Sequence, residues 1–304
     1  MDANRQGEPA PFPIEPDIEH VHSVLHRLGI EIRKPPVTTS GLHEIDVWGR
    51  ESDLIELRSG LESAGLLPYR PHRRADHRFF LGLGSQGWIK VDVKLRGKEQ
   101  SQIIGDLAWL LRRRRGMVVA LLGADGAGKS TASECVEKSM PIDVTSRYLG
   151  DARRSPAGRR PRKVRVSPAR RMAGLAKWIV TTLMKLWSLE VAARRGTVVV
   201  CDRHPIEAGH IGGESRFVRT IKRGVIRTLA PGPDLIVLLD APGEILFARK
   251  GEHSPEHLDR MSEVWRRVIE RNRGIVIGVD RPADQVCHDI QEQIWVRLAK
   301  RRAS

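Results

Sequence analysis

The second part of the chain alternates short runs of consecutive apolar residues with longer amphipathic segments. The apolar runs are MVVALLG (117–123), IDVTSRYLG (142–150), TVVVCD (197–202), DLIVLLD (234–240) and GIVIGVD (274–280). Strands without polar alternation are typical of a parallel sheet that is covered on both faces. Helical spacing follows in the segments 172–193, 256–272 and 283–302. This alternation predicts that residues 117–304 form an α/β domain with helices on both faces of a parallel sheet.

The first part of the chain has a different pattern, with strands that alternate apolar and polar residues. Expected strands are 30–34, 42–49, 78–84 and 87–95, and expected helices are 17–29, 50–65 and 99–115. This order predicts a smaller α+β domain over residues 17–112. Residues 1–16 are polar and rich in proline, which predicts a disordered leader.

Composition and charge limit the function classes. No secretory signal or membrane span is visible, and the three cysteines are far apart, so we expect a reduced, cytoplasmic protein without disulfides. The net charge of +15 favours a polyanionic partner. Basic residues are dense in the loop 152–171, which suggests nucleic acid or an anionic membrane surface, with a location peripheral to the membrane. The alternative is a solvated loop in an arginine-rich protein.

The sequence GADGAGKST (123–131) fits the P-loop pattern G-x-x-x-x-G-K-[ST] between an apolar strand and a helix. Glycines let backbone N–H groups turn toward phosphate oxygens, and the helix N-terminus adds its positive dipole end. Lys129 would reach the β- and γ-phosphates of ATP, and the Ser130 hydroxyl would ligate Mg²⁺. The predicted nucleotide-binding residues are Gly123, Asp125, Gly126, Ala127, Gly128, Lys129, Ser130 and Thr131.

A P-loop protein also needs an acid at the end of a neighbouring strand to hold magnesium. Two strands supply one, at Asp202 and at Asp240. We predict Asp202 as the metal residue, because the adjoining Arg203 places a positive charge where phosphates would meet. Asp240 is predicted to have a structural role.

Residues 117–304 resemble the thymidylate kinase family of P-loop nucleoside monophosphate kinases. The resemblance rests on GADGAGKST, on the triplet DRH (202–204), and on PDLIVLLDAP followed by ARKGE. It implies an ATP- and Mg²⁺-dependent kinase, commonly a homodimer, with catalytic residues Lys129, Asp202, Arg203 and Arg249. Asp125 would approach the sugar of the acceptor, and Arg249 with Lys250 would belong to a lid over the phosphates.

The acceptor-reading parts of that family differ in this chain. Its Arg-x-Pro-Gly stretch is replaced by TSRYLGDARRSP, where Arg147 can substitute for the arginine, and its thymine-gripping residues are not visible in 172–193. The acceptor is therefore open: a nucleotide or another phosphorylated molecule, a polynucleotide end, or a lipid- or glycan-linked substrate. The segment 172–193 is either a core helix lining the acceptor cleft or a helix on an anionic membrane. A further alternative is an ATP-binding regulatory protein with little turnover.

In the first domain, Glu44, Asp46 and Asp92 lie on two expected strands. Glu44 and Asp46 are two residues apart, so they project from the same face, and Asp92 joins them if the strands are neighbours. Three carboxylates on one face suit two-metal nucleotidyl transfer. Residues 17–112 resemble the nucleotidyltransferase superfamily in this pattern, although its Gly-Ser turn is absent. The alternative is that these acids are exposed residues of a half-buried strand.

Overall fold

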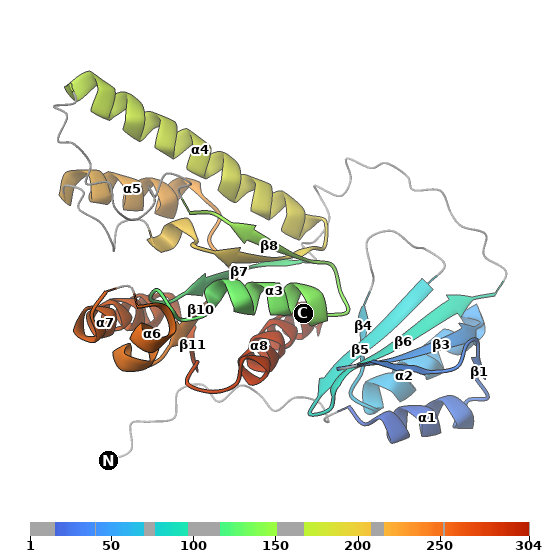
Figure 1. Cartoon of the computed structure of the whole chain (residues 1–304). Coiled ribbons are helices and arrows are strands. Elements are labelled where there is room, and N and C mark those ends of the chain that lie inside the picture. Colours follow the sequence, from blue (N-terminus) through green and yellow to red (C-terminus); the bar gives the residue numbers. More distant parts are fainter. Residues whose placement is uncertain are drawn as a thin grey trace, which may run out of the picture. The chain divides into compact units, whose positions relative to one another are not determined.

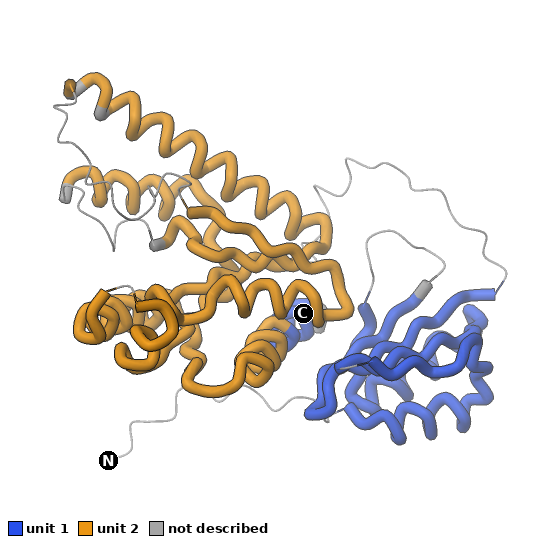
Figure 2. Tube along the Cα trace, viewed as in Figure 1, with its two compact units in different colours: residues 1–105, 295–304 blue, residues 106–294 orange. Residues whose placement is uncertain are grey.

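A computed structural model of the chain describes residues 16–39, 41–69, 77–96, 116–150, 167–207, 216–251 and 253–303. It contains two compact units (Figure 2), residues 1–105 with 295–304 and residues 106–294. The expected helix 99–115 and nearly all of the expected leader and of the basic loop 152–171 lie outside the described residues. Among the helices that the structure describes, none combines the length and hydropathy needed to cross a bilayer.

The first unit is a mixed sheet with two helices on one face. Its strands are ordered β1-β3-β6-β5-β4, and β2 pairs with β3 outside this path. The elements are α1 (Ile18–Arg27), β1 (Glu31–Ile32), β2 (Val37–Thr39), β3 (Leu42–Gly49), the 3-10 helix η1 (Glu51–Asp53), α2 (Leu54–Ser63), β4 (Leu67–Tyr69), β5 (His77–Gly84) and β6 (Gly87–Leu95). The helices bury residues such as Leu25 and Leu57 against Ile45 and Val47 of β3. The other face of β3 therefore carries Glu44 and Asp46.

The second unit contains a five-stranded sheet in the order β11-β10-β7-β9-β8, with every neighbouring pair parallel. This confirms the expected parallel α/β architecture. The elements are β7 (Met117–Leu122), α3 (Lys129–Ser139), β8 (Val144–Tyr148), α4 (Pro168–Arg194), β9 (Val198–Asp202), the 3-10 helix η3 (Pro205–Glu207), α5 (Arg216–Leu229), β10 (Leu235–Asp240), α6 (Gly243–Lys250), α7 (Pro255–Asn272), β11 (Ile275–Gly278) and α8 (Ala283–Ala303), of which the residues from Trp295 on belong to the first unit. Helices α5 and α6 were not among the expected elements.

Helices cover both faces of this sheet (Figure 1). Across the sheet, the connection β7-α3-β8 moves toward the β8 edge, whereas the connections β8-α4-β9 and β10-α7-β11 move toward the β11 edge. Because such crossovers are right-handed, α3 lies on one face, and α4 and α7 lie on the opposite one. In agreement, Val118 packs against α4, while Ala120 and Leu122, on the same side of β7, pack against Trp265 of α7. The P-loop thus leaves the centre of a sheet that is buried on both sides.

Helix α4 begins four residues before the segment predicted from hydropathy. Its N-cap is Ser167, whose hydroxyl accepts a hydrogen bond from the backbone N–H of Arg170 at 3.4 Å, and Pro168 occupies the first turn. Proline suits this position because its missing N–H would have no partner within the helix. Toward its other end, Leu186, Leu189 and Ala193 join the core of the sheet.

The cysteines correct one sequence expectation, because Cys135 and Cys287 form a disulfide. They are 152 residues apart in sequence, but α3 and α8 meet and bring their Cα atoms within 6.2 Å. A hydrogen bond from Gln291 Nε2 to Ser139 Oγ, at 2.6 Å, joins the same two helices. Spacing in the sequence could not reveal this pair, because the meeting of the helices is a tertiary event. Cys201 is buried and free, and burial raises the pKa of its thiol to about 12.

Reduction of this disulfide is expected to destabilise the second unit. A crosslink that closes a loop of this length restricts the unfolded chain and contributes about 4–5 kcal/mol to the free energy of unfolding. Urea unfolding with and without dithiothreitol measures the effect, and Cys287→Ser should make the unfolding midpoint insensitive to the reductant. Alkylation of the denatured, unreduced protein should label Cys201 alone. Labelling of all three cysteines would contradict the crosslink.

Candidate functional site: the phosphate loop and its surroundings

The phosphate loop connects the end of β7 to the first turn of α3, and its backbone requires glycine at specific positions. Gly126 has φ +91°, and a Cβ there would lie 2.5 Å from the carbonyl oxygen of Leu246. Gly128 caps α3 with φ +79°. Both angles are in the left-handed region, where side chains other than glycine are strained. The loop therefore packs closely against α6 while the N-terminus of α3 stays open toward the cavity.

Lys129 is held by the loop that it follows. Its side chain is buried, and Nζ donates hydrogen bonds to the carbonyl oxygens of Gly123 at 2.8 Å and of Ala124 at 3.0 Å. These contacts hold a buried ammonium group against the loop, so little side-chain freedom remains to be lost when an anion binds. The arrangement suits a lysine that contacts phosphate.

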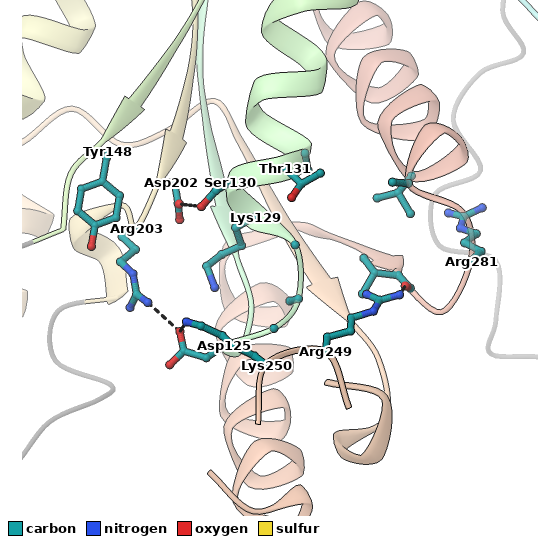
Figure 3. A pocket seen from close by; sticks show the side chains of 17 residues that line it. Asp125, Lys129, Ser130, Thr131, Tyr148, Asp202, Arg203, Arg249, Lys250 and Arg281 are labelled. Carbon is teal, nitrogen blue, oxygen red and sulfur yellow. Dashed lines mark hydrogen bonds and ion pairs between the residues drawn. The ribbon is translucent and has the colours of Figure 1, made fainter. Parts of the chain in front are cut away.

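Ser130 and Asp202 meet at the end of β9, as the metal prediction requires. Ser130 Oγ donates a hydrogen bond to Asp202 Oδ2 at 2.7 Å (Figure 3). The other carboxylate oxygen, Asp202 Oδ1, is buried and has no hydrogen-bond partner among the described residues. A buried, unsatisfied carboxylate oxygen beside a serine hydroxyl fits a divalent cation with oxygen ligands. Asp240 Oδ1 is likewise buried without a partner among the described residues, but Asp240 Oδ2 is paired with Arg266 at 2.6 Å, so a side chain of the protein already balances the charge of that carboxylate.

A second group of charges surrounds Asp125, within the loop itself. Arg203 Nη2 lies 2.7 Å from Asp125 Oδ1, and Lys250 Nζ lies 3.9 Å from the same oxygen (Figure 3). His253 Nε2 is 3.9 Å from Asp125 Oδ2. Burial alone would raise the pKa of Asp125, but the charges of Arg203, Lys129 and Lys250 outweigh it and lower this pKa. The carboxylate is therefore ionised and holds two cations beside the loop.

The backbone at Arg203 is in an uncommon conformation. Its φ is +59°, in the left-handed region that non-glycine residues rarely occupy. The conformation turns the arginine out of β9 toward Asp125. The next residue, His204, is buried, and its Nδ1 accepts a hydrogen bond from the backbone N–H of Ile206 at 3.2 Å. His204 thereby fixes the turn that follows Arg203. Local strain of this kind concentrates at functional sites.

His204 predicts a specific pH dependence of stability. Burial lowers the pKa of its imidazole from the ordinary 6.5 to about 4. Between these values the unfolded chain binds a proton that the folded chain does not, so the free energy of unfolding falls as pH is lowered from 6.5 to 4, by roughly 3 kcal/mol. Urea unfolding across this range measures it. His204→Asn, which keeps a hydrogen-bond acceptor, should remove this part of the pH dependence; an unchanged slope would contradict the assignment.

The phosphate loop borders a cavity of about 630 Å³. From the predicted set it includes Asp125, Gly126, Ala127, Gly128, Lys129, Ser130, Thr131, Asp202, Arg203 and Arg249. The other lining residues are Ala132, Tyr148, Lys250, Val279, Arg281, Ala283 and Val286, and among them the sequence predicted a role only for Lys250. The segment after β11 contains most of the missed residues and has no motif. The sequence signal that could have indicated this segment was its position between the end of a parallel strand and the next helix, where ligands bind in sheets of this type.

The two basic residues at the end of α6 point to different parts of the cavity. Lys250 is near Asp125, whereas Arg249 Nη2 donates a hydrogen bond to the carbonyl oxygen of Val279 at 2.7 Å. Figure 3 shows Arg249 on the side of Arg281, away from the side occupied by Arg203 and Tyr148. Of this pair, Lys250 is therefore the residue placed at the loop acid in this structure.

The carboxylates of the first unit are neutralised by basic residues. Asp46 and Asp92 are direct neighbours in the parallel register of β3 and β6, and Arg33 Nη2 lies 3.0 Å and 3.5 Å from their Oδ2 atoms. Glu44 is paired with Lys90 at 2.5 Å. Across the described ranges, no three acidic, histidine or cysteine side chains are grouped so as to hold a metal ion. Strands β3 and β6 are neighbours, as the prediction required, but the positive charges beside these carboxylates come from Arg33 and Lys90.

No protein-family model matches the chain, and no curated protein matches it. Among solved structures, the chain is similar to a thymidylate kinase from Candida albicans, whose published description concerns broad substrate specificity and a novel structural element. The match has 14% sequence identity and a TM-score of 0.42, and it covers 60% of this chain and 93% of that one.

Proposed function

We propose that the protein is an ATP-dependent phosphotransferase that moves the γ-phosphate of ATP to a phosphorylated acceptor, with a nucleotide as the first candidate. The observation that supports it best is the convergence of cations from three separate elements on one loop: Lys129 from α3, Arg203 from the end of β9, and Lys250 from α6. Nucleotide binding alone requires the loop and its lysine. A second set of cations beside the loop suits an acceptor phosphate.

The cavity offers separate places for donor and acceptor. Val279, Ala283 and Val286 provide an apolar surface beside Arg249, suited to the base of the donor nucleotide. On the other side of the loop, Tyr148 at the end of β8 lies near Arg203 (Figure 3), where an aromatic ring and a guanidinium group suit a phosphorylated sugar or base. In this arrangement the phosphates of both molecules meet at the N-terminus of α3, where the helix dipole favours negative charge.

The chemistry requires positioned positive charge more than a proton acceptor. In-line transfer spreads negative charge over the equatorial oxygens of the moving group, and fixed cations stabilise it. Lys129 would contact the donor phosphates, and Arg203 would hold the acceptor phosphate in line. An acceptor that already bears a phosphate needs little help from a general base. Ser130 and Asp202 would hold Mg²⁺, which when bound neutralises phosphate charge.

Transfer of labelled γ-phosphate from ATP to a panel of acceptors tests the proposal. The panel contains the nucleoside monophosphates, short DNA and RNA ends, and an extract of lipid phosphates. Transfer to a phosphorylated acceptor would support the proposal, and the acceptor that is labelled would name the substrate class. ATP binding without transfer to any of them would instead favour a nucleotide-binding regulatory protein.

The carboxylates of the first unit are expected to play no part in phosphate transfer. Asp46→Asn combined with Asp92→Asn should leave the rate unchanged, because both side chains contact Arg33 in the first unit and neither lines the cavity. The rate of γ-phosphate transfer, once an acceptor is identified, provides the measurement. Loss of transfer in a variant that circular dichroism shows to be folded would contradict this separation.

A further inference from the structure

Helix α4 exposes a row of large apolar side chains. Met172, Val180, Met184 and Trp187 are 59%, 56%, 69% and 52% exposed. Steps of eight, four and three residues place them on one side of the helix, and we call them the α4 apolar row. The buried residues Leu186 and Leu189 lie on another side, against the sheet. Single exposed apolar residues are ordinary, but a row of four marks a surface that contacts something apolar.

The surroundings of this row are positively charged. Helices α4 and α5 lie side by side (Figure 1), and Lys222 of α5 packs 4.3 Å from the ring of Trp178 in α4. Each of the two helices has five basic residues, and the one acid between them is Glu190. Glu190 is buried and paired with Arg194 at 2.9 Å. No exposed carboxylate of either helix therefore offsets their cations.

Three of these cations are exposed on the same helix as the apolar row: Arg170, Lys177 and Lys185. Long basic side chains can place their charge at the level of lipid headgroups while their methylene groups cover apolar surface. Trp187 donates its indole N–H to the carbonyl oxygen of Leu229 in α5 at 3.3 Å, so the exposed part of this side chain is its apolar ring. In α5, Phe217 and Leu229 add two exposed apolar side chains.

We propose that the exposed surface of α4, with the cations of α5, docks the protein onto an anionic lipid bilayer. Helix α4 would lie in the plane of the interface, with the α4 apolar row inserted among the lipid chains and Lys177 and Lys185 at the headgroups. Each basic residue close to an anionic leaflet strengthens binding by roughly fivefold, and the apolar side chains add to it. None of the described residues that line the phosphate-loop cavity comes from α4 or α5, so docking through these helices leaves the proposed nucleotide site accessible.

Charge favours a lipid surface over a second copy of the chain. In a two-fold symmetric dimer the same patch occurs on both partners. Such pairing through α4 would bring Lys177 and Lys185 near their own copies, and neither α4 nor α5 has an exposed acid to compensate. Phosphate-bearing headgroups supply the missing negative charge together with an apolar phase beneath it.

Vesicle flotation tests the proposal directly. The full-length protein is mixed with vesicles of phosphatidylcholine alone or with about one-third phosphatidylglycerol. It should float with the anionic vesicles, more at low than at high salt, and remain unbound with the neutral ones. Val180→Ser with Met184→Ser should weaken binding by about tenfold, because two side chains lose their insertion into the bilayer. Lys177→Gln with Lys185→Gln should weaken it by a similar factor or more.

Matched variants distinguish binding through this surface from non-specific binding to vesicles. Ile55→Ser removes a side chain that is 82% exposed in the first unit, and Lys138→Gln with Arg271→Gln removes two charges from α3 and α7; both variants should float like the wild type. Binding that survives Val180→Ser with Met184→Ser would overturn the proposal in favour of a surface that attracts any polyanion. Sedimentation could instead show that the wild type is a dimer and that Val180→Ser with Met184→Ser is a monomer. If in addition neither protein floats with vesicles, the surface binds a second copy of the chain.

Discussion

Replacing Lys129 by alanine is expected to reduce γ-phosphate transfer by about 10³-fold. The ammonium group is buried at the loop and held by the carbonyl oxygens of Gly123 and Ala124, so its position beside the proposed donor phosphates is fixed. Its loss removes positive charge from the donor phosphates both when ATP is bound and in the transition state. The steady-state rate of transfer to the acceptor found in the panel measures the whole effect. Equilibrium binding of labelled ATP measures how much of it is a loss of affinity for ATP.

Lys138→Ala is the matched control for Lys129→Ala. It removes a lysine from the same helix, but from an exposed site where the lysine is paired with Glu134 at 3.6 Å, and it should leave transfer unchanged. Thermal unfolding of both variants shows whether either is misfolded. Wild-type transfer by a folded Lys129→Ala protein would exclude the P-loop as the phosphate site.

Replacing Arg203 by glutamine is expected to lower kcat by about 10²- to 10³-fold. Its guanidinium group lies at the loop acid and faces the place assigned to the acceptor phosphate. A neutral side chain there would neither hold that phosphate in line nor stabilise the charge that develops during transfer. The KM for the acceptor should rise as well, because the same contact forms when the acceptor binds.

Arg249→Gln provides the contrast for Arg203→Gln. Arg249 donates to the carbonyl oxygen of Val279 on the other side of the cavity, so its replacement should raise the KM for ATP and leave kcat largely unchanged. Equal losses of kcat in the two variants would show that Arg249 also reaches the moving phosphate, as the family resemblance implies. The comparison thus separates a charge that acts in transfer from one that positions the donor.

Much of the second unit follows from local sequence. The apolar runs at 117–122, 198–202 and 235–240 specify buried parallel strands, because a strand without polar alternation must be covered on both faces. The phosphate loop is equally local, since its glycines and Lys129 are consecutive residues between one strand and one helix. The pairing of Ser130 with Asp202 was also predictable, because the carboxyl ends of neighbouring parallel strands meet at one edge.

The missed parts depend on segments that are distant in sequence. The left-handed Arg203 reaches Asp125 across 78 residues, and the sequence around Arg203 contains no glycine or asparagine to announce the turn. Helix α5 is a short amphipathic segment with several basic residues, a pattern that is also typical of a solvated segment. Only the tertiary structure shows that it packs beside α4. In the first unit, alternation correctly put Glu44 and Asp46 on one face, but it could not show that Arg33 and Lys90 fill the space beside them.

The sequence by itself determined the parallel strands, the phosphate loop and the acid at the end of β9, because each is recorded in a short run of consecutive residues. The tertiary structure alone decided which cations face the loop, which cysteines are joined and which side of α4 stays exposed. These outcomes depend on the packing of helices and strand ends that lie far apart in the chain, and no local pattern of residues records that packing.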